Sequence, residues 1–313
     1  MLANYPCDLH GHTNRSDGSD TPVEFILHAE ERGMKIAAIT DHDIRPPTTV
    51  TVDGVEEDIL VFAKKHGVQL LRGIEISCET HVEDTHLVCF GCDWNSPYFD
   101  RLEASVIESK IGSYKKLVEK LTEAGMPMTW DEVLDNNGYP VKPEMVQKKM
   151  IFELMGRKGY TKDWQSAKLF IKQSPNLAVE REKPTAKSVL QEIHRIGGIV
   201  IMAHPHLVVE PVAYEGQSIS RREYIDILID AGLDGIEARY TYDKTSYGGG
   251  LTPEEIEQEV KSLYAPRGLI ISAGSDYHAD SKKGVKNPRD IGDRGLTMEE
   301  FMAEKRLVAL LPK

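Results

Sequence analysis

Residues 5–12 read Tyr-Pro-Cys-Asp-Leu-His-Gly-His, a short extended segment that ends in two histidines two positions apart. Alternate side chains of an extended segment point the same way, so His10 and His12 can present two imidazoles to one cation. A lone His-x-His pair also fits a surface loop. The metal-binding interpretation gains weight because similar polar residues follow other predicted strands of this chain.

Short apolar, β-branched runs alternate with amphipathic helical stretches, which is typical of a parallel sheet in an α/β fold. No G-x-G-x-x-G motif follows the first run, so a (β/α) barrel is favoured over an open dinucleotide-binding sheet. Capping boxes predict helix starts at Thr21, Ser220, Thr252 and Thr297. We expect strands at residues 5–9, 35–40, 69–74, 86–90, 199–203, 235–238 and 269–273, with a weaker eighth near 307–311.

One stretch, residues 95–183, departs from this alternation because it has helical spacing and little strand character. We interpret it as a helical insertion between two barrel segments, residues 1–94 and 184–313. Thr185 is expected to cap the helix that follows the insertion.

Acidic and imidazole side chains lie at or near the predicted strand ends, chiefly the carboxyl-terminal ends. In a parallel barrel these ends converge on one face, where active sites are built. Imidazoles and carboxylates together suit Zn, Mn or Fe, and the set exceeds the roughly four to six ligands that one ion uses. The sequence therefore predicts two to three divalent ions. The candidate ligands are His10, His12, Asp17, His42, Glu75, His86, His204, Asp276 and His278.

The composition is ordinary for a soluble globular protein. The chain has 313 residues, a net charge of −12, and 40% hydrophobic and 28% charged residues, which excludes collagen-like, coiled-coil and disordered designs. No apolar run approaches the ~18 residues of a membrane span and no signal peptide is recognisable, so we expect a cytoplasmic protein with no membrane partner. The negative charge disfavours long nucleic acids as partners. Nothing in the composition indicates an oligomeric state.

Two further motifs have a structural and a functional interpretation. Cys89-x-x-Cys92 has redox spacing, but it lies within or just after a predicted strand, which favours a packed thiol pair. Residues 248–250 are three glycines that lack the Lys-Ser/Thr of a phosphate-binding loop, so we interpret them as a mobile loop.

The motifs Asp8-Leu9-His10-Gly11-His12, Thr40-Asp41-His42-Asp43, Ala203-His204-Pro205 and Asp276-Tyr277-His278 resemble those of the PHP (polymerase and histidinol phosphatase) family. The similarity is to its free-standing metal-dependent phosphoesterases, which include nucleoside 3′,5′-bisphosphate phosphatases and related cyclic-phosphate phosphoesterases. It covers about residues 5–93 and 187–278. It implies a distorted seven-stranded (β/α) barrel of PHP type with a trinuclear metal centre, and a helical insertion that contributes to the substrate pocket.

The resemblance also implies how the metal ligands divide. Asp8 and Asp41 would orient imidazoles of the ligands. The first ion would take His10, His12, Glu75 and Asp276, the second Glu75, His86 and His204, and the third Asp17, His42 and His278.

Such a centre predicts a hydrolase acting on phosphate esters, either monoesters or diesters. The metals would neutralise phosphate oxygens and lower the pKa of a bridging water towards about 7, so that hydroxide attacks phosphorus. Glu75 is catalytic in this scheme as the bridging ligand. His206 and Tyr277, which lie beside the ligands in sequence, are candidates to protonate the leaving group.

A phosphate group of the substrate that lies away from the metals needs cationic side chains to bind it. Arg239 directly follows the sixth strand and either binds substrate or forms a structural ion pair. Arg15, in a ligand-bearing loop, and Lys142 are further candidates. Relatives carry a Gly-Arg-Pro-His segment in the insertion, whereas residues 139–144 here read Tyr-Pro-Val-Lys-Pro-Glu.

We therefore expect a metal-dependent phosphoesterase acting on a small phosphorylated metabolite, namely a nucleotide, a sugar phosphate or a cyclic phosphate. One alternative is an amidohydrolase-type C–N hydrolase, which the lack of a lysine beside the ligands disfavours. The other is a non-catalytic metal-binding module, which the full set of ligands disfavours.

Overall fold

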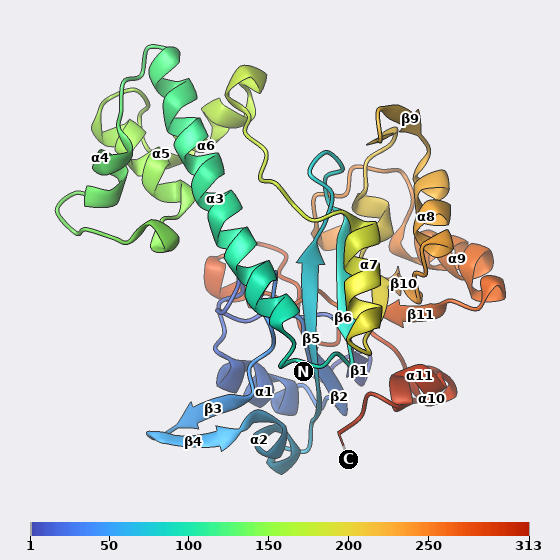
Figure 1. Cartoon of the computed structure of the whole chain (residues 1–313). Helices are drawn as coiled ribbons and strands as arrows, with labels where there is room; N and C mark the ends of the chain where they lie inside the picture. The colour runs from blue at the N-terminus through green and yellow to red at the C-terminus, as the bar shows by residue number, and fades with distance from the viewer. Residues whose placement is uncertain (1, 313) are drawn as a thin grey trace. The chain divides into compact units, whose positions relative to one another are not determined.

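The computed structural model describes residues 2–312 as a mixed α/β protein (Figure 1). The chain divides into two compact units. The first comprises Met1–Asp100 and Pro184–Lys313 and holds the main sheet, and the second comprises Arg101–Lys183 and is helical.

Seven strands form the main sheet in the order β1-β2-β5-β6-β7-β10-β11. A backbone hydrogen bond from Leu9, which follows β1, to the carbonyl of Ala273 at the end of β11 (3.2 Å) joins the two edges of the sheet, so the sheet is a nearly closed, distorted barrel, as expected. The strands are β1 (Cys7–Asp8), β2 (Ile36–Ile39), β5 (Gln69–Ser77), β6 (His86–Phe90), β7 (Ile199–Met202), β10 (Gly235–Arg239) and β11 (Ile270–Ala273).

One strand reverses the expected direction. β6 pairs antiparallel with both β5 and β7, whereas the other neighbouring pairs are parallel. A short connection, residues 78–85, joins β5 to β6 without a crossover helix (Figure 1). The first residue of β6, His86, therefore lies at the same end of the barrel as the last residues of the parallel strands.

Five helices of this unit start where the sequence predicted. Capping boxes at Thr21, Ser220, Thr252 and Thr297 are all formed, and Thr185 accepts a hydrogen bond from the backbone of Ser188. The helices are α1 (Pro22–Glu31), α2 (Ile59–Lys65), α7 (Ala186–Arg195), α8 (Arg221–Asp230), α9 (Pro253–Tyr264), α10 (Met298–Ala303) and α11 (Lys305–Val308).

Two features differ from the sequence-based expectation. The segment predicted as a weak eighth strand forms α11 and a turn, because Glu304 caps a short helix there. Two small antiparallel hairpins were not predicted, β3 (Thr49–Val52) with β4 (Val55–Asp58) and β8 (Val212–Tyr214) with β9 (Gln217–Ile219).

Alternate side chains of the strands pack on opposite faces of the sheet. Ile36 and Ala38 of β2 belong to a buried cluster that also contains Phe301 and Leu307 of the C-terminal helices. Ala37 and Ile39 belong to a second cluster, which α1 and α2 cover. Because apolar side chains fill both clusters, polar groups are left to gather at the strand ends.

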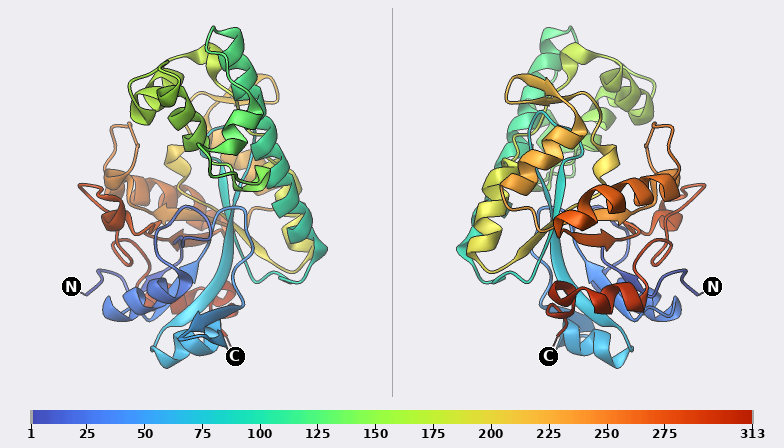
Figure 2. Two further views of the ribbon diagram at one scale, coloured as in Figure 1. Left: turned by 90° about the vertical axis from the view of Figure 1, so that its left-hand side faces the viewer. Right: turned by 90° about the vertical axis from the view of Figure 1, so that its right-hand side faces the viewer.

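The helical unit has an apolar core of its own. The unit contains the carboxyl-terminal part of α3 (Pro97–Glu123), with α4 (Trp130–Asp135), α5 (Lys148–Arg157) and α6 (Trp164–Lys172) (Figure 2). Leu121 of α3, Ile151 and Met155 of α5 and Ala167 of α6 are buried together. Across residues 2–312, no helix has the length and apolar character needed to cross a bilayer.

Candidate metal centre

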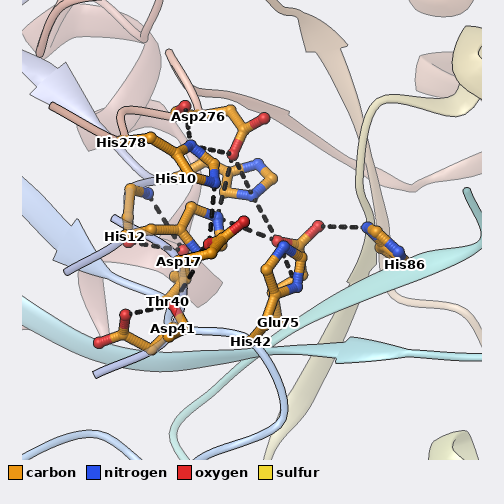
Figure 3. A network of polar contacts seen from close by, with 12 residues as sticks. His10, His12, Asp17, Thr40, Asp41, His42, Glu75, His86, Asp276 and His278 are labelled. Atoms are coloured by element: carbon orange, nitrogen blue, oxygen red, sulfur yellow. Dashed lines mark hydrogen bonds and ion pairs between the residues drawn. The ribbon is translucent and has the colours of Figure 1, made fainter. Parts of the chain in front are cut away.

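The polar residues at the barrel's strand ends surround one carboxylate, that of Glu75 on β5, which is fully buried (Figure 3). One of its oxygens, Oε2, lies 3.0 Å from His10 Nε2, 3.1 Å from His12 Nε2 and 3.3 Å from His42 Nδ1. The other, Oε1, lies 3.1 Å from both His86 Nδ1 and His204 Nε2. The structure thus brings five imidazoles from four segments of the chain around a single side chain.

Asp276 and Asp17 extend this cluster. Asp276 Oδ1 lies 3.0 Å from His12 Nε2, and Asp17 Oδ1 lies 3.0 Å from His278 Nε2 (Figure 3). All nine candidate ligands therefore lie in one cluster. Three groups have ligand atoms within 4.8 Å of one another, and these are His10, His12, Glu75 and Asp276; His12, Asp17, His42 and His278; and His42, Glu75 and His86.

The donor set fits metal ions. Within residues 2–312, several buried atoms of the cluster have no hydrogen-bond partner: His10 Nε2, both ring nitrogens of His12, His42 Nδ1, Glu75 Oε2 and His204 Nδ1. Some of these atoms lie near opposite charge without forming an aligned hydrogen bond. Buried polar groups of native proteins are almost always paired, so this concentration of unpaired donors and acceptors points to cations as the missing partners.

The carboxylates of the cluster are held in the ionised form that metal binding requires. Burial alone would raise the pKa of Glu75, but the imidazoles of His10, His42 and His86 lower it well below its usual value. Burial would also raise the pKa of Asp276, but His278 and His10 lower it well below its usual value. Two buried anionic ligands are thus available at neutral pH.

The backbone is strained where it presents these ligands. His204 and Asp276 both have a positive φ, 27° and 54°, which non-glycine residues rarely adopt. Gly274 lies against His10, and a Cβ at this position would be only 2.3 Å from the Cβ of His10. A glycine is therefore required for the ends of β1 and β11 to approach each other.

Asp8 and Asp41 do not contact imidazoles, contrary to the expectation. Asp8 accepts hydrogen bonds from the backbone of His10, Ser275 and Gly292 and from the Ser275 hydroxyl. Asp41 accepts from Thr13 and Ser16. Both carboxylates instead fix the loops that carry the ligands.

Glu237 on β10, which the sequence analysis missed, is the carboxylate that orients an imidazole. Its Oε1 lies 3.2 Å from His10 Nδ1, and its Oε2 accepts a hydrogen bond of 2.8 Å from the backbone N–H of His204. It is 3% exposed. An acceptor at Nδ1 keeps the proton on that nitrogen and leaves Nε2 of His10 free to bind a cation.

The two candidate proton donors lie away from the cluster. Tyr277 donates from its hydroxyl to Asp20 and packs edge-on against Phe25. His206 lies in a separate cavity of about 150 Å³ between α8 and α9, and its Nε2 is 3.8 Å from Glu259. Burial and Arg221 lower the pKa of His206 to about 4. Neither side chain is placed to protonate a leaving group at the cluster.

Arg239 forms an ion pair, the structural alternative left open above. Its Nε and Nη2 donate to Glu257 at 2.9 and 2.7 Å, its Nη1 and Nη2 reach Glu300, and Nη1 also donates to the carbonyl of Gly295. The guanidinium is stacked on Tyr5 and is 7% exposed. All three of its nitrogens are engaged, which leaves none for a substrate.

Arg15, the second substrate-binding candidate, is not among the residues that line the pocket described below. Arg15 donates to the carbonyl of Arg45 at 2.8 Å. Lys142 is exposed in the helical unit, directly before a 3-10 turn at Pro143–Met145.

A pocket of about 250 Å³ opens over the cluster. His42, Glu75, His86, His204, Asp276 and His278 line one part of it. Lys244 and Arg289, two cations that the sequence analysis did not single out, also line it. Arg289 stands 13 residues after Asp276, with which it forms an ion pair, in a loop without any motif that sequence reasoning could use.

The thiols of Cys89 and Cys92 are free and buried, and each contacts a backbone carbonyl of its own strand region. Burial raises the pKa of both, that of Cys92 to about 12. These are the properties of packed thiols rather than of a redox pair.

Comparison with known proteins supports the family resemblance. The family model for the PHP domain matches residues 8–145, which include His10, His12, Asp17, His42, Glu75 and His86. The solved structure of a metal-dependent phosphoesterase from Bifidobacterium adolescentis superposes with a TM-score of 0.64, at 22% identity over 100% of this chain and 99% of that chain. The resemblance to PHP metal-dependent phosphoesterases is confirmed, and this structure shares the fold.

Three curated relatives act on phosphate esters by name. The chain is 26% identical over 291 residues to the 3′,5′-nucleoside bisphosphate phosphatase of Chromobacterium violaceum, covering 91% of this chain and 90% of that protein. It is 25% identical over 275 residues to the phosphoribosyl 1,2-cyclic phosphate 1,2-diphosphodiesterase of Eggerthella lenta, covering 87% and 93%. It is 29% identical over 203 residues to a 5′-3′ exoribonuclease of Haemophilus influenzae, covering 63% and 68%.

Proposed function

We propose that this chain, whose residues 8–145 match the PHP domain, is a metal-dependent hydrolase of phosphate ester bonds in small phosphorylated metabolites. The observation that carries the proposal is the arrangement of five imidazoles around the buried carboxylate of Glu75, with Asp276 and Asp17 completing the cluster. Such a set of ligands suits two to three ions of Mn, Fe or Zn.

When bound, the ions would supply a hydroxide nucleophile and neutralise the charge of the phosphate oxygens. The protein's own contribution is to hold the ligands in place. Glu75 has both oxygens turned to imidazoles, so both oxygens would help to hold the ions, and Glu237 keeps His10 in the tautomer that leaves Nε2 free.

The size of the pocket favours a small substrate. About 250 Å³ lies below the roughly 300–1,000 Å³ of pockets that hold drug-sized ligands, so only a phosphorylated sugar, or one end of a larger molecule, fits inside. A nucleoside bisphosphate, a cyclic ribose phosphate and a sugar phosphate all meet this requirement, and two of them match the names of the curated relatives.

A second candidate is the removal of one nucleotide at a time from the end of a short oligoribonucleotide. It is favoured by the similarity to the exoribonuclease of Haemophilus influenzae. The pocket would then receive the terminal nucleotide alone. This relative weakens our sequence-based expectation that long nucleic acids are not partners, although a net charge of −12 still opposes binding of a long polyanion.

A hydrolysis screen in which the products are identified by chromatography tests the proposal, because ring opening of a cyclic phosphate releases no inorganic phosphate. Protein loaded with Mn would be incubated with nucleotides, sugar phosphates, cyclic phosphates and a short oligoribonucleotide, and with a panel of cyclic amides for the C–N alternative. Glu75→Gln serves as the inactive variant, and Glu79→Gln, whose carboxylate instead caps Ala186, serves as the matched control. Hydrolysis of a phosphate ester bond that needs Glu75 and not Glu79 is expected. Turnover of amides alone, or of nothing, would contradict the proposal.

A further inference from the structure

The pocket over the metal centre has a cationic wall that none of the metal ligands forms. Lys244 follows β10, and Arg289 lies in the loop between β11 and α10. We propose that Arg289 and Lys244 form a subsite for a second anionic group of the substrate, such as a phosphate remote from the scissile one. This inference rests on the proposed function and names the substrate class that the site selects.

Two hydrogen bonds hold Arg289 in place and leave one edge of its guanidinium unpaired. Its Nε donates to Asp280 at 2.8 Å and its Nη1 donates to Asp276. For Nη2, no partner is found among residues 2–312. The side chain lines the pocket and is 16% exposed, so the remaining N–H groups are available to a ligand. Arg239 differs, because all three of its nitrogens are paired outside the pocket.

Lys244 adds a second cation next to Arg289. Its Nζ donates to the carbonyl of Pro288 at 2.9 Å and to Asp293 at 2.7 Å, which holds it against the residue that precedes Arg289. An ammonium group has three donors, so one remains after these two contacts. Thr245 and Ser246, the next two residues, line the pocket as well; the Thr245 hydroxyl donates to the carbonyl of Tyr242 and holds this loop in place.

The charge around the pocket is uneven, which gives a substrate a preferred orientation. The connection between β5 and β6 contributes a carboxylate, Asp84, beside the metal ligand His86. The loops after β10 and β11 contribute the two cations. A substrate whose reacting phosphate lies on the metals is therefore attracted to Lys244 and Arg289 by its second anion and repelled from Asp84.

Arginine suits a phosphate subsite because its planar guanidinium has several N–H groups. Some of them can bind a phosphate while the others remain hydrogen-bonded to a carboxylate. The contact between Arg289 and the candidate ligand Asp276 also ties the subsite to the metal centre, so the distance between the two bound phosphates is fixed by the fold. The subsite would favour a ribose with a phosphate group at each end over the same sugar with one phosphate.

The test compares two substrates that differ only in the second phosphate, adenosine 3′,5′-bisphosphate and adenosine 3′-monophosphate. The measured quantity is the ratio of their kcat/KM values. Lys244→Met and Arg289→Lys should each lower this ratio about tenfold to a hundredfold, the loss typical of one charge-assisted contact. Lys286→Met is the matched control, because Lys286 is exposed in the same loop as Arg289 and lies outside the pocket; it should leave the ratio at the wild-type value.

Bound metal and thermal unfolding would be measured for every variant, since Arg289 contacts Asp276. If Arg289→Lys loses metal or does not fold, the ratio in Lys244→Met decides. A wild-type ratio in Lys244→Met, or a wild-type enzyme that hydrolyses both substrates with equal kcat/KM, would overturn the subsite and leave the proposed function standing. A loaded wild-type enzyme that hydrolyses no phosphate ester in the screen would instead overturn the proposed function.

Discussion

Glu237 offers a sharp test of how the metal centre is organised, because it contacts two candidate ligands without belonging to the metal-binding groups itself. Glu237→Gln keeps the size of the side chain and one acceptor oxygen. The amide can therefore accept from the His204 backbone or from His10 Nδ1, but not from both. If its NH₂ group faces His10, the imidazole must place its proton on Nε2, the nitrogen that would bind the ion.

The expected loss of metal affinity follows from these contacts. A hydrogen bond to a charged group is worth about 1.5–3 kcal/mol, and loss of a partner that orients a metal-binding histidine typically weakens metal affinity about 10–100-fold. We expect Glu237→Gln to raise the dissociation constant of the weakest-held ion by that factor. Glu237→Ala should have a larger effect and should also lower the melting temperature of the metal-free protein, because it leaves two buried donors unpaired.

The assay is a Mn titration of metal-depleted protein in competition with a chelator, combined with thermal unfolding. The matched control is Glu257→Gln, the same chemical change at a carboxylate that pairs with Arg239 and does not contact an imidazole in the structure. The control should affect stability without affecting Mn affinity. Equal Mn affinity in wild type and Glu237→Gln, or an equal loss in the control, would refute the reasoning.

Three further predictions concern the bridging carboxylate, the thiols and one ion pair. Glu75→Ala should abolish phosphate release while the far-UV circular dichroism stays that of the wild type, and retained turnover would exclude a bridging role. Cys89 and Cys92, whose pKa values burial raises, should react with a thiol reagent at pH 8 only after unfolding, whereas rapid labelling of the native protein would revive the redox interpretation. A hydrogen bond to Asp290 raises the pKa of His28, so this pair stabilises the fold fully below the unfolded-state pKa of about 6.5 and loses its effect as the pH rises through the folded-state pKa. The melting temperatures of wild type and His28→Gln should accordingly converge as the pH rises above about 6.5, and a gap that widens with pH would contradict this.

Much of the cluster could be predicted because its residues stand at strand ends, which a parallel barrel brings to one face. The alternation of His10 and His12 and the position of Asp276 and His278 after an apolar run were sufficient signals. His86 lies there for a different reason, since its strand runs antiparallel and begins rather than ends at the cluster. The sequence does not reveal this reversal, because a short apolar run has no direction.

The direction of individual side chains was harder to predict. A register shift between Glu237 and Arg239 breaks the alternation of β10, so the two residues, two positions apart, do not share one environment. Glu237 contacts His10 inside the site, whereas Arg239 pairs with Glu257. Arg289 reaches the pocket through a long loop, and no local pattern indicates that the loop folds back onto Asp276.

Counting metal ions tests the central claim most directly. Elemental analysis of protein purified without chelator, and again after reconstitution with excess Mn or Zn, should find between two and three ions per chain, because ligands from so many segments exceed what one ion can use. Phosphate release should disappear when the ions are removed and return when they are restored. At most one ion per folded chain, even after reconstitution, would contradict a centre built around Glu75 as a bridging ligand.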